Sequence, residues 1–179
     1  VVNGALLDPE KYELELFGIE NKDGTINYGF FEKAKDGTLL IDEISEIPLS
    51  TQAKILRVLI DQKFKRLNGS AKINVNVRII STSSKVIREE VDKGNFREDL
   101  YHRLNVVPVL LPPLKDRSED IPLLLNYFSK KISELNGTSE TKFDTNFNLL
   151  YKYDWPGNIR ELRNLVERIS ILSVNEKKT

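Results

Sequence analysis

The pattern of apolar and polar residues before Pro112 alternates between short apolar runs and amphipathic stretches. Thr38 to Ile41 and Val77 to Thr82 are short apolar runs, which is typical of buried strands in a parallel sheet. Ser50 to Asp61 repeats with the period of a helix instead. We expect the apolar face of that helix to pack against the sheet. This face would consist of Leu49, Ala53, Leu56 and Ile60.

Turn residues divide the rest of this region into smaller elements. Pro9 to Phe17 is predicted to be a helix that Gly18 ends. The polar stretch IENKDGTINY, residues 19–28, indicates a surface loop or hairpin. A short helix is expected around Phe30 to Ala34, and a second hairpin across Phe64 to Ile73.

Two consecutive prolines, Pro112 and Pro113, mark a change of pattern. Val106 to Leu111 reads as a third strand, placed at a sheet edge because Pro108 has no amide proton to donate. Beyond the prolines the periodicity is helical, over Ile121 to Leu135, Asp144 to Tyr153 and Ile159 to Leu172. We therefore expect an α/β domain over residues 1–112 and an all-helical subdomain over residues 113–179.

The composition narrows the class of protein. Lysine plus arginine and aspartate plus glutamate each number 27 among 179 residues, so net charge does not draw the whole chain to nucleic acid or to an anionic membrane. The chain contains no cysteine, and no apolar run approaches the roughly 20 residues that span a bilayer. We expect a cytoplasmic protein without membrane contact. Because the chain lacks methionine and begins with valine, we interpret it as a piece of a longer protein.

Two adjacent carboxylates, Asp42 and Glu43, follow the apolar run in GTLLIDEI. Ligands of open parallel sheets lie just beyond the carboxyl ends of the strands. In phosphoryl-transfer sites an aspartate helps to hold Mg²⁺, and a neighbouring group can orient the attacking water. The pair is therefore a candidate site of nucleotide hydrolysis. A strand followed by an acidic turn is the alternative that this segment leaves open.

Four separated segments carry a resemblance to a known family. They are ELFG at residues 15–18, GTLLIDEI at 37–44, FREDLYHRLNV at 96–106 and WPGNIRELRN at 155–164. Together they resemble the AAA+ ATPase domain of bacterial enhancer-binding activators, which remodel sigma-54 RNA polymerase. Within that family the sequence is most similar to nitrogen-assimilation response regulators of the NtrX type. The resemblance implies an α/β fold, a partial AAA+ P-loop NTPase sheet followed by a helical lid, with ATP and Mg²⁺ as cofactors.

The resemblance also implies roles for particular residues. Asp42 and Glu43 match the Walker B pair, so Asp42 would support Mg²⁺, mostly indirectly, and Glu43 would polarise the hydrolytic water. Arg160 matches the second-sensor arginine of the lid, and Ser84 lies where the first sensor is expected. Asn3 matches a strand-end asparagine that acts as a switch by restraining the Walker B glutamate. The segment expected to line the nucleotide consists of Ala34, Lys35, Asp36, Gly37, Thr38, Leu39, Leu40, Ile41, Asp42 and Glu43.

Two further arginines, Arg97 and Arg103, match those that family members present to the γ-phosphate of a neighbouring subunit. Such arginine fingers are worth roughly 10³ to 10⁵ in rate, because they meet charge that develops on the transferring phosphoryl group. Without the resemblance, the simpler interpretation makes both arginines surface partners of Glu98 and Asp99. By the same reasoning Arg160 would be an exposed helix residue.

The chain departs from the family at two places. No GxxxxGK[ST] motif occurs, so the phosphate-binding loop is absent, and truncation upstream of Val1 is the simplest explanation. The isolated chain is then expected to show no ATP hydrolysis. The second departure is that residues 19–28 contain no GAFTGA, the loop with which the family contacts sigma-54. This difference argues against ordinary sigma-54 remodelling.

Two functional hypotheses follow. The first is the central ATPase domain of a two-component transcriptional response regulator, with ATP hydrolysis coupled to oligomerisation and transcription control. Its implied partners are copies of itself in a ring, RNA polymerase or a sigma factor, DNA through a domain absent from this chain, and a sensor kinase through an absent receiver domain. The alternative is a non-hydrolysing, nucleotide-responsive oligomerisation module of a transcription regulator.

Overall fold

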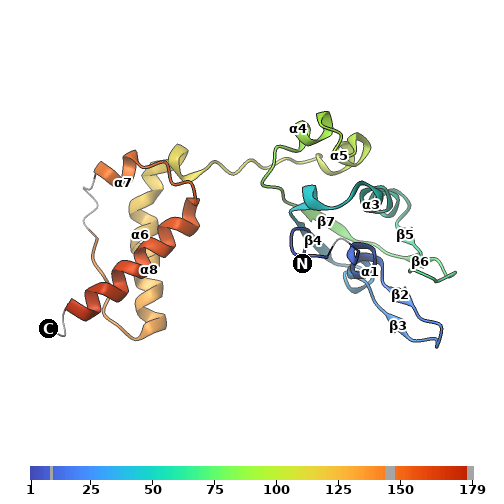
Figure 1. Ribbon diagram of the computed structural model, residues 1–179, viewed down its shortest axis with the longest axis horizontal. Helices are drawn as coiled ribbons and strands as arrows, with labels where there is room; N and C mark the ends of the chain where they lie inside the picture. Colours follow the sequence, from blue (N-terminus) through green and yellow to red (C-terminus); the bar gives the residue numbers. More distant parts are fainter. Residues whose placement is uncertain (9, 144–147, 177–179) are drawn as a thin grey trace. The chain divides into compact units, whose positions relative to one another are not determined.

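The computed structural model describes every residue except 9, 144–147 and 177–179. The chain folds into two compact units, Val1–Pro108 and Val109–Thr179 (Figure 1). The first contains a parallel sheet with helices, and the second is helical in its described residues. The division falls a few residues before the boundary expected after residue 112.

A three-stranded parallel sheet forms the centre of the first unit. Its strands are β1 (Val2–Asn3), β4 (Thr38–Asp42) and β7 (Arg78–Ser81), in the spatial order β1-β4-β7. Asn3 lies opposite Asp42, and Ile41 lies opposite Ser81, so the three strands end at one edge of the sheet. The strands predicted at Thr38 to Ile41 and at Val77 to Thr82 are therefore confirmed.

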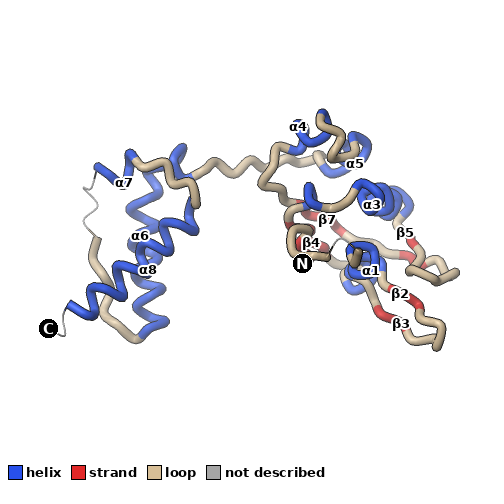
Figure 2. The backbone as a smooth tube through the Cα atoms, in the orientation of Figure 1, coloured by secondary structure: helices blue, strands red, loops and turns tan. Residues whose placement is uncertain are grey.

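Short helices build the rest of the first unit, and Figure 2 shows the loops that connect them. The helix predicted from Pro9 begins at Tyr12 in the structure, and residue 9 itself lies outside the described part of the chain. Gly18 ends this helix with a φ of 75°, as predicted. Buried side chains of the helices and the sheet form one hydrophobic core. The helices are α1 (Tyr12–Phe17), α2 (Phe30–Lys33), α3 (Leu49–Asp61), α4 (Ile87–Asp92) and α5 (Glu98–Leu104), with a 3-10 turn at Ile44–Glu46.

The buried face of α3 differs from the prediction. Leu49 and Ile60 are 44% and 61% exposed, whereas Ile55 is fully buried. Gln52 explains the difference, because its side chain is fully buried and hydrogen-bonded on both sides. Its Nε2 donates to two backbone carbonyls at 2.8 and 3.2 Å, and its Oε1 accepts from the amide of Arg97 at 2.9 Å. Gln52 was expected to face solvent, but a polar side chain can be buried when its hydrogen-bonding groups have partners in the protein.

Two antiparallel hairpins extend from the core on the same side of the first unit (Figure 1). β5 (Lys63–Phe64) pairs with β6 (Ile73–Asn74), which confirms the hairpin predicted across Phe64 to Ile73. β2 (Ile19–Glu20) pairs with β3 (Ile26–Asn27), so the stretch predicted to be a surface loop or hairpin is a hairpin. The hairpins touch, because the amide of Glu20 donates to the carbonyl of Leu67 at 3.0 Å. Three phenylalanine rings next to their bases contact one another, namely Phe17, Phe31 and Phe64.

The second unit is built from α-helices that follow a 3-10 segment at Leu114–Asp120. The helices are α6 (Ile121–Asn136), α7 (Asn148–Lys152) and α8 (Asn158–Glu176). The two long predicted helices are therefore confirmed, whereas residues 144–147 of the middle one lie outside the described residues. No helix in the described residues combines the length and apolarity needed to cross a bilayer. The core of the unit contains Leu114, Ile121, Leu125, Ile132, Trp155, Leu162 and Val166.

The strand predicted at Val106 to Leu111 is absent. Val106 and Val107 lie in the turn after α5, and residues 108–111 have no regular structure. The apolar side chains of this stretch are 73% to 91% exposed. The residues of this stretch have the apolar composition of a strand. A strand also needs a neighbouring strand to pair with, and no described segment pairs with this one.

Candidate functional site

Polar side chains converge where the strands of the parallel sheet end. Asn3 ends β1, Asp42 ends β4, and Thr82 directly follows β7. Because the strands are parallel and in register, these residues come together although about forty positions separate each pair in the sequence. This is the carboxyl edge, at which open α/β sheets bind their ligands.

The carboxylate of Asp42 is held from both neighbouring strands. Asn3 Nδ2 donates to Asp42 Oδ2 at 2.8 Å, and Thr82 Oγ1 donates to Asp42 Oδ1 at 2.5 Å. Thr82 Oγ1 also accepts a hydrogen bond from the amide of Glu43 at 3.1 Å. Each carboxylate oxygen of Asp42 therefore has one protein donor and retains a lone pair for another partner.

Glu43 occupies a left-handed backbone conformation, with φ of 53° and ψ of 54°. Its Oε2 accepts two hydrogen bonds from Ser84, one from the amide at 2.9 Å and one from the hydroxyl at 3.0 Å. The amide of Asn3, which we expected to restrain Glu43, contacts Asp42 instead. In this structure the restraint on the glutamate comes from Ser84, because Asn3 is opposite Asp42 in the strand register.

The segment expected to line the nucleotide is not gathered around the acids. Ala34 to Gly37 form the turn before β4, at the amino end of the strand, whereas Asp42 stands at its carboxyl end. At about 3.3 Å per residue, the start of β4 lies on the order of 13 Å from Asp42. The side chains of Leu39 and Ile41 are buried in the core. Of that segment, the structure places only Asp42 and Glu43 at the carboxyl edge of the sheet.

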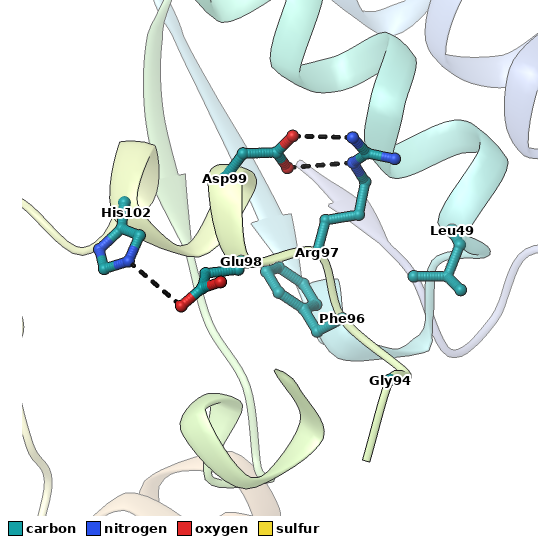
Figure 3. A pocket seen from close by; sticks show the side chains of 7 residues that line it. All are labelled: Leu49, Gly94, Phe96, Arg97, Glu98, Asp99 and His102. Carbon is teal, nitrogen blue, oxygen red and sulfur yellow. Dashed lines mark hydrogen bonds and ion pairs between the residues drawn. The ribbon is translucent and has the colours of Figure 1, made fainter. Parts of the chain in front are cut away.

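Arg97 lies just before α5 and forms a two-pronged ion pair with Asp99 (Figure 3). Its Nε and Nη2 donate to Asp99 Oδ1 and Oδ2 at 3.0 and 2.7 Å. These hydrogen bonds raise the pKa of Arg97 and lower the pKa of Asp99. The Arg97 side chain remains 40% exposed, and it lines an open depression of about 630 Å³. The pairing agrees with the simpler interpretation of Arg97, while its exposure leaves the side chain accessible to another chain.

Arg103 has a different environment within its own subunit. Its Nη2 donates to the carbonyl oxygen of Leu59 at 3.0 Å. Leu59 lies in the last turn of α3, where helix carbonyls lack intrahelical partners and where a cation is favoured by the helix dipole. Arg103 therefore stabilises the end of a core helix, a role that the sequence did not indicate.

Arg160 lies at the start of α8, in the second unit, and its side chain is exposed. It forms no hydrogen bond or ion pair with any residue that the structure describes. The neighbouring Glu161 accepts hydrogen bonds from the amide of Gly157 at 2.8 Å and from the hydroxyl of Tyr153 at 2.9 Å. The sensor role of Arg160 stays a prediction.

Three residues of the site escaped the sequence analysis. Thr82 could have been found, since it ends an apolar run in the same manner as Asp42. Gly4 could not have been found from the sequence, because it is needed where two backbone segments approach closely. A Cβ at this position would lie 2.5 Å from the carbonyl oxygen of Glu43. Gln52, which fixes the backbone of Arg97, likewise acts through contacts that only the fold creates.

The donor set at the carboxyl edge fits a magnesium nucleotide. Asp42 offers oxygen ligands of the kind Mg²⁺ prefers, and Glu43 supplies a second acid beside it. Among the described residues, no cluster of three or more histidine, cysteine, aspartate or glutamate side chains could hold a metal ion. A magnesium ion here would therefore be held largely by phosphate oxygens and water, with Asp42 as the contribution of the chain.

Two family models match the sequence, one for each unit. The sigma-54 interaction domain matches residues 1–110, and the AAA+ ATPase lid domain matches residues 115–178. The nitrogen assimilation regulatory protein NtrX of Azorhizobium caulinodans is 47% identical over 175 residues, which cover 97% of this chain and 38% of that protein. The regulatory protein AtoC of Escherichia coli K12 is 45% identical over 177 residues, covering 96% and 38%. The chain thus spans well under half the length of these relatives.

Solved structures share the fold. NtrX from Brucella abortus in complex with ADP and in complex with ATP each superpose with a TM-score of 0.89 at 46% identity, covering 96% of this chain and 38% of theirs. Hsp104 superposes with a TM-score of 0.61 at 16% identity, covering 99% of this chain and 36% of its own, a likeness of fold alone. These structures confirm the expected α/β class with a helical lid.

Proposed function

The chain belongs to the sigma-54 interaction domain family, and on that premise we propose that it is the ATP-binding AAA+ domain of a two-component transcriptional response regulator of the NtrX type. In this role ATP hydrolysis is coupled to assembly of a ring and to transcription control. The observation that carries the proposal is the placement of Asp42 and Glu43 together at the carboxyl edge of the sheet, each fixed by residues at or just beyond the ends of neighbouring strands.

The relatives support ATP as the nucleotide, because the Brucella abortus NtrX structures are complexes with ADP and with ATP. We assign ATP and Mg²⁺ as cofactors of this chain as well. Asp42 would help to hold the metal ion, mostly through water, and the bound Mg²⁺ would neutralise charge on the phosphates. Ser84 and Arg160 are the further candidates for contact with the phosphates.

Glu43 is the residue that orients the water molecule for attack. Its Oε2 is occupied by two hydrogen bonds from Ser84, whereas no described residue donates to Oε1. These two hydrogen bonds hold the Glu43 side chain in one orientation, the role that the resemblance had given to Asn3.

Arg97 is the better of the two candidate arginine fingers. Its partner Asp99 is only two positions away and 48% exposed, so exchanging Asp99 for a phosphate of a neighbouring subunit leaves the core intact. Arg103 would have to leave the carbonyl of Leu59 at the end of α3. We therefore propose that Arg97 meets the γ-phosphate and that Arg103 mainly positions α5 against α3.

The test uses the full-length protein, in which steady-state ATP hydrolysis is measured. Glu43→Gln keeps the shape of the side chain and removes its charge, so hydrolysis should fall by about 100-fold or more while ATP still binds. Glu134→Gln, an exposed position on α6, is the matched control and should leave hydrolysis unchanged. Equal hydrolysis by Glu43→Gln and wild-type protein would contradict the proposal.

The short β2–β3 hairpin favours a second candidate function. Residues 19–28 contain no GAFTGA, and the hairpin that they form ends in a turn at Gly24 with only two paired residues on each strand. A non-hydrolysing module that regulates transcription through assembly needs no such loop. If Glu43→Gln leaves transcription control intact in the full-length protein, that function is favoured. Tight binding of the full-length protein to sigma-54 would argue for ordinary remodelling instead.

A further inference from the structure

A groove rich in positive charge lies between the end of α3 and the β5–β6 hairpin. Its volume is about 590 Å³. Among the described residues, Asp61 is the only carboxylate that lines it, against six cationic side chains. This concentration of charge contrasts with the whole chain, in which positive and negative residues balance. The six cations are Lys54, Arg57, Lys63, Lys65, Arg66 and Lys72.

Two of these cations are already neutralised within the chain. Lys54 pairs with Glu13, and Arg66 forms a two-pronged pair with Glu32 at 2.9 and 2.6 Å. The other four form no ion pair with any residue in the described part of the chain, and all four are exposed. The groove therefore presents unpaired positive charge on a rigid support, because Arg66 and Glu32 are only 12% and 17% exposed.

The lining of the groove discriminates between classes of anionic ligand. Its aromatic residues, Phe17 and Phe64, are 4% and 8% exposed, so their faces are committed to the core. Single-stranded nucleic acid is bound through exposed aromatic faces on which the bases stack, and the described residues that line the groove offer none. The exposed ring of Tyr28 lies beside the groove, but it already contacts the Arg66 guanidinium, which is 5.4 Å from the ring centroid. Half-buried Leu67 provides an apolar contact beside the cations. Carboxylates interspersed with aliphatic side chains fit this combination.

We propose that this groove is a docking site for an acidic segment of a partner protein, bound in extended form with its carboxylates on Arg57, Lys63, Lys65 and Lys72. The site is separate from the carboxyl edge of the sheet, since none of its lining residues contributes to the contacts of Asp42 or Glu43. Peptide binding at the groove needs no nucleotide. A failure of peptide binding would therefore leave the ATPase proposal untouched, and a loss of ATP hydrolysis would leave the groove proposal untouched.

The test measures binding of a fluorescein-labelled peptide of alternating glutamate and leucine to the 179-residue chain by fluorescence anisotropy. Binding should weaken as salt is raised, because the charges at the groove are exposed. A peptide with glutamine in place of glutamate should not bind. Labelled oligothymidylate is the probe for the competing class of ligand, and tighter binding of that probe than of the acidic peptide would overturn the proposal.

Charge variants locate the binding. Arg57→Glu combined with Lys65→Glu should weaken peptide binding by about tenfold or more. Lys115→Glu combined with Lys130→Glu makes the same change in net charge on the second unit and should have little effect. Asp61→Asn removes the only carboxylate of the groove and should tighten binding by about threefold, a gain that a misfolded variant cannot produce. Equal weakening by both double variants, or no gain from Asp61→Asn, would contradict the proposal.

Discussion

The hydroxyl of Ser84 donates to the same carboxylate oxygen of Glu43 that accepts the amide of Ser84, at 3.0 and 2.9 Å. One serine thus supplies both hydrogen bonds to the acid that we assign to hydrolysis. Because one of the two bonds is a side-chain bond, a substitution can remove it and leave the backbone bond in place.

Ser84→Ala should raise the basal ATP hydrolysis of the full-length protein. Loss of a hydrogen bond worth roughly 1 kcal/mol leaves the Glu43 side chain freer to turn towards water, so the expected increase is about two- to fivefold. Ser83→Ala is the control, because the hydroxyl of Ser83 bonds to Ser45 and to a backbone carbonyl instead. A fall in hydrolysis for Ser84→Ala would mean that Ser84 orients Glu43 productively.

Substitution of Arg103 should lower the stability of the fold more than substitution of Arg97. Arg103→Ala removes the hydrogen bond to the carbonyl of Leu59, and we expect it to lower the free energy of unfolding by about 1 kcal/mol. Arg97→Ala removes only an exposed ion pair and should change stability little. Urea denaturation of the 179-residue chain measures both. Equal destabilisation by the two variants would show that the contact with α3 is not what Arg103 contributes.

Glu90 should make the first unit sensitive to acid. Its carboxylate is 9% exposed, and hydrogen bonds from Asn95 and Lys93, both at 3.0 Å, lower its pKa in the folded chain. A lowered pKa means that the stabilisation is complete above the ordinary range of glutamate and is lost as pH falls through the folded value. The urea midpoint should therefore decline on acidification.

Glu90→Gln tests this dependence by removing the titrating group. The decline in urea midpoint from neutral to acid pH should be shallower in the variant than in the wild type. Glu89→Gln is the neighbouring control, since Glu89 is exposed and lies 3.7 Å from Lys93. An acid decline that is as steep in Glu90→Gln as in the wild type would exclude Glu90 as a source of the pH dependence.

Gly29 should tolerate no side chain. A Cβ at this position would lie 2.4 Å from the amide nitrogen of Gly18 and 2.5 Å from the carbonyl oxygen of Leu16. Both atoms belong to the backbone and cannot move aside, so Gly29→Ala should cost more than about 2 kcal/mol. Gly24→Ala, at the tip of the same hairpin, meets no atom within 4 Å and should cost about 1 kcal/mol through its φ of 83° alone. Urea denaturation compares the two, and similar losses would refute the steric argument.

The sequence was most informative where structure is decided locally. The apolar run of β4, the acids after it and the glycine-centred hairpins each carry their own signal within a few residues, and all were predicted. Thr82 carries the same local signal as Asp42, because it also stands at the end of an apolar run.

Tertiary contacts decided the features that were missed. The face of α3 depended on whether Gln52 could be buried, which in turn depended on carbonyls and an amide that approach only in the folded chain. The stretch from Val106 to Leu111 has the composition of a strand, but pairing is a property of two segments, and a single sequence run cannot specify its partner. Asn3 contacts Asp42, and not Glu43 as had been expected, for a similar reason: the parallel register places Asn3 opposite Asp42.

The backbones of Gly18 and Gly29 lie in contact at the base of the β2–β3 hairpin. The two glycines close the base of the β2–β3 hairpin, so the ten residues between them can be replaced or lengthened without disturbing α1 or α2. Extending a loop whose ends are already joined costs little, since closure entropy grows only slowly with length. The first unit therefore has a graft point, at which an output loop can be acquired, exchanged or lost in evolution, or spliced in by design, while the carboxyl edge of the sheet stays as it is.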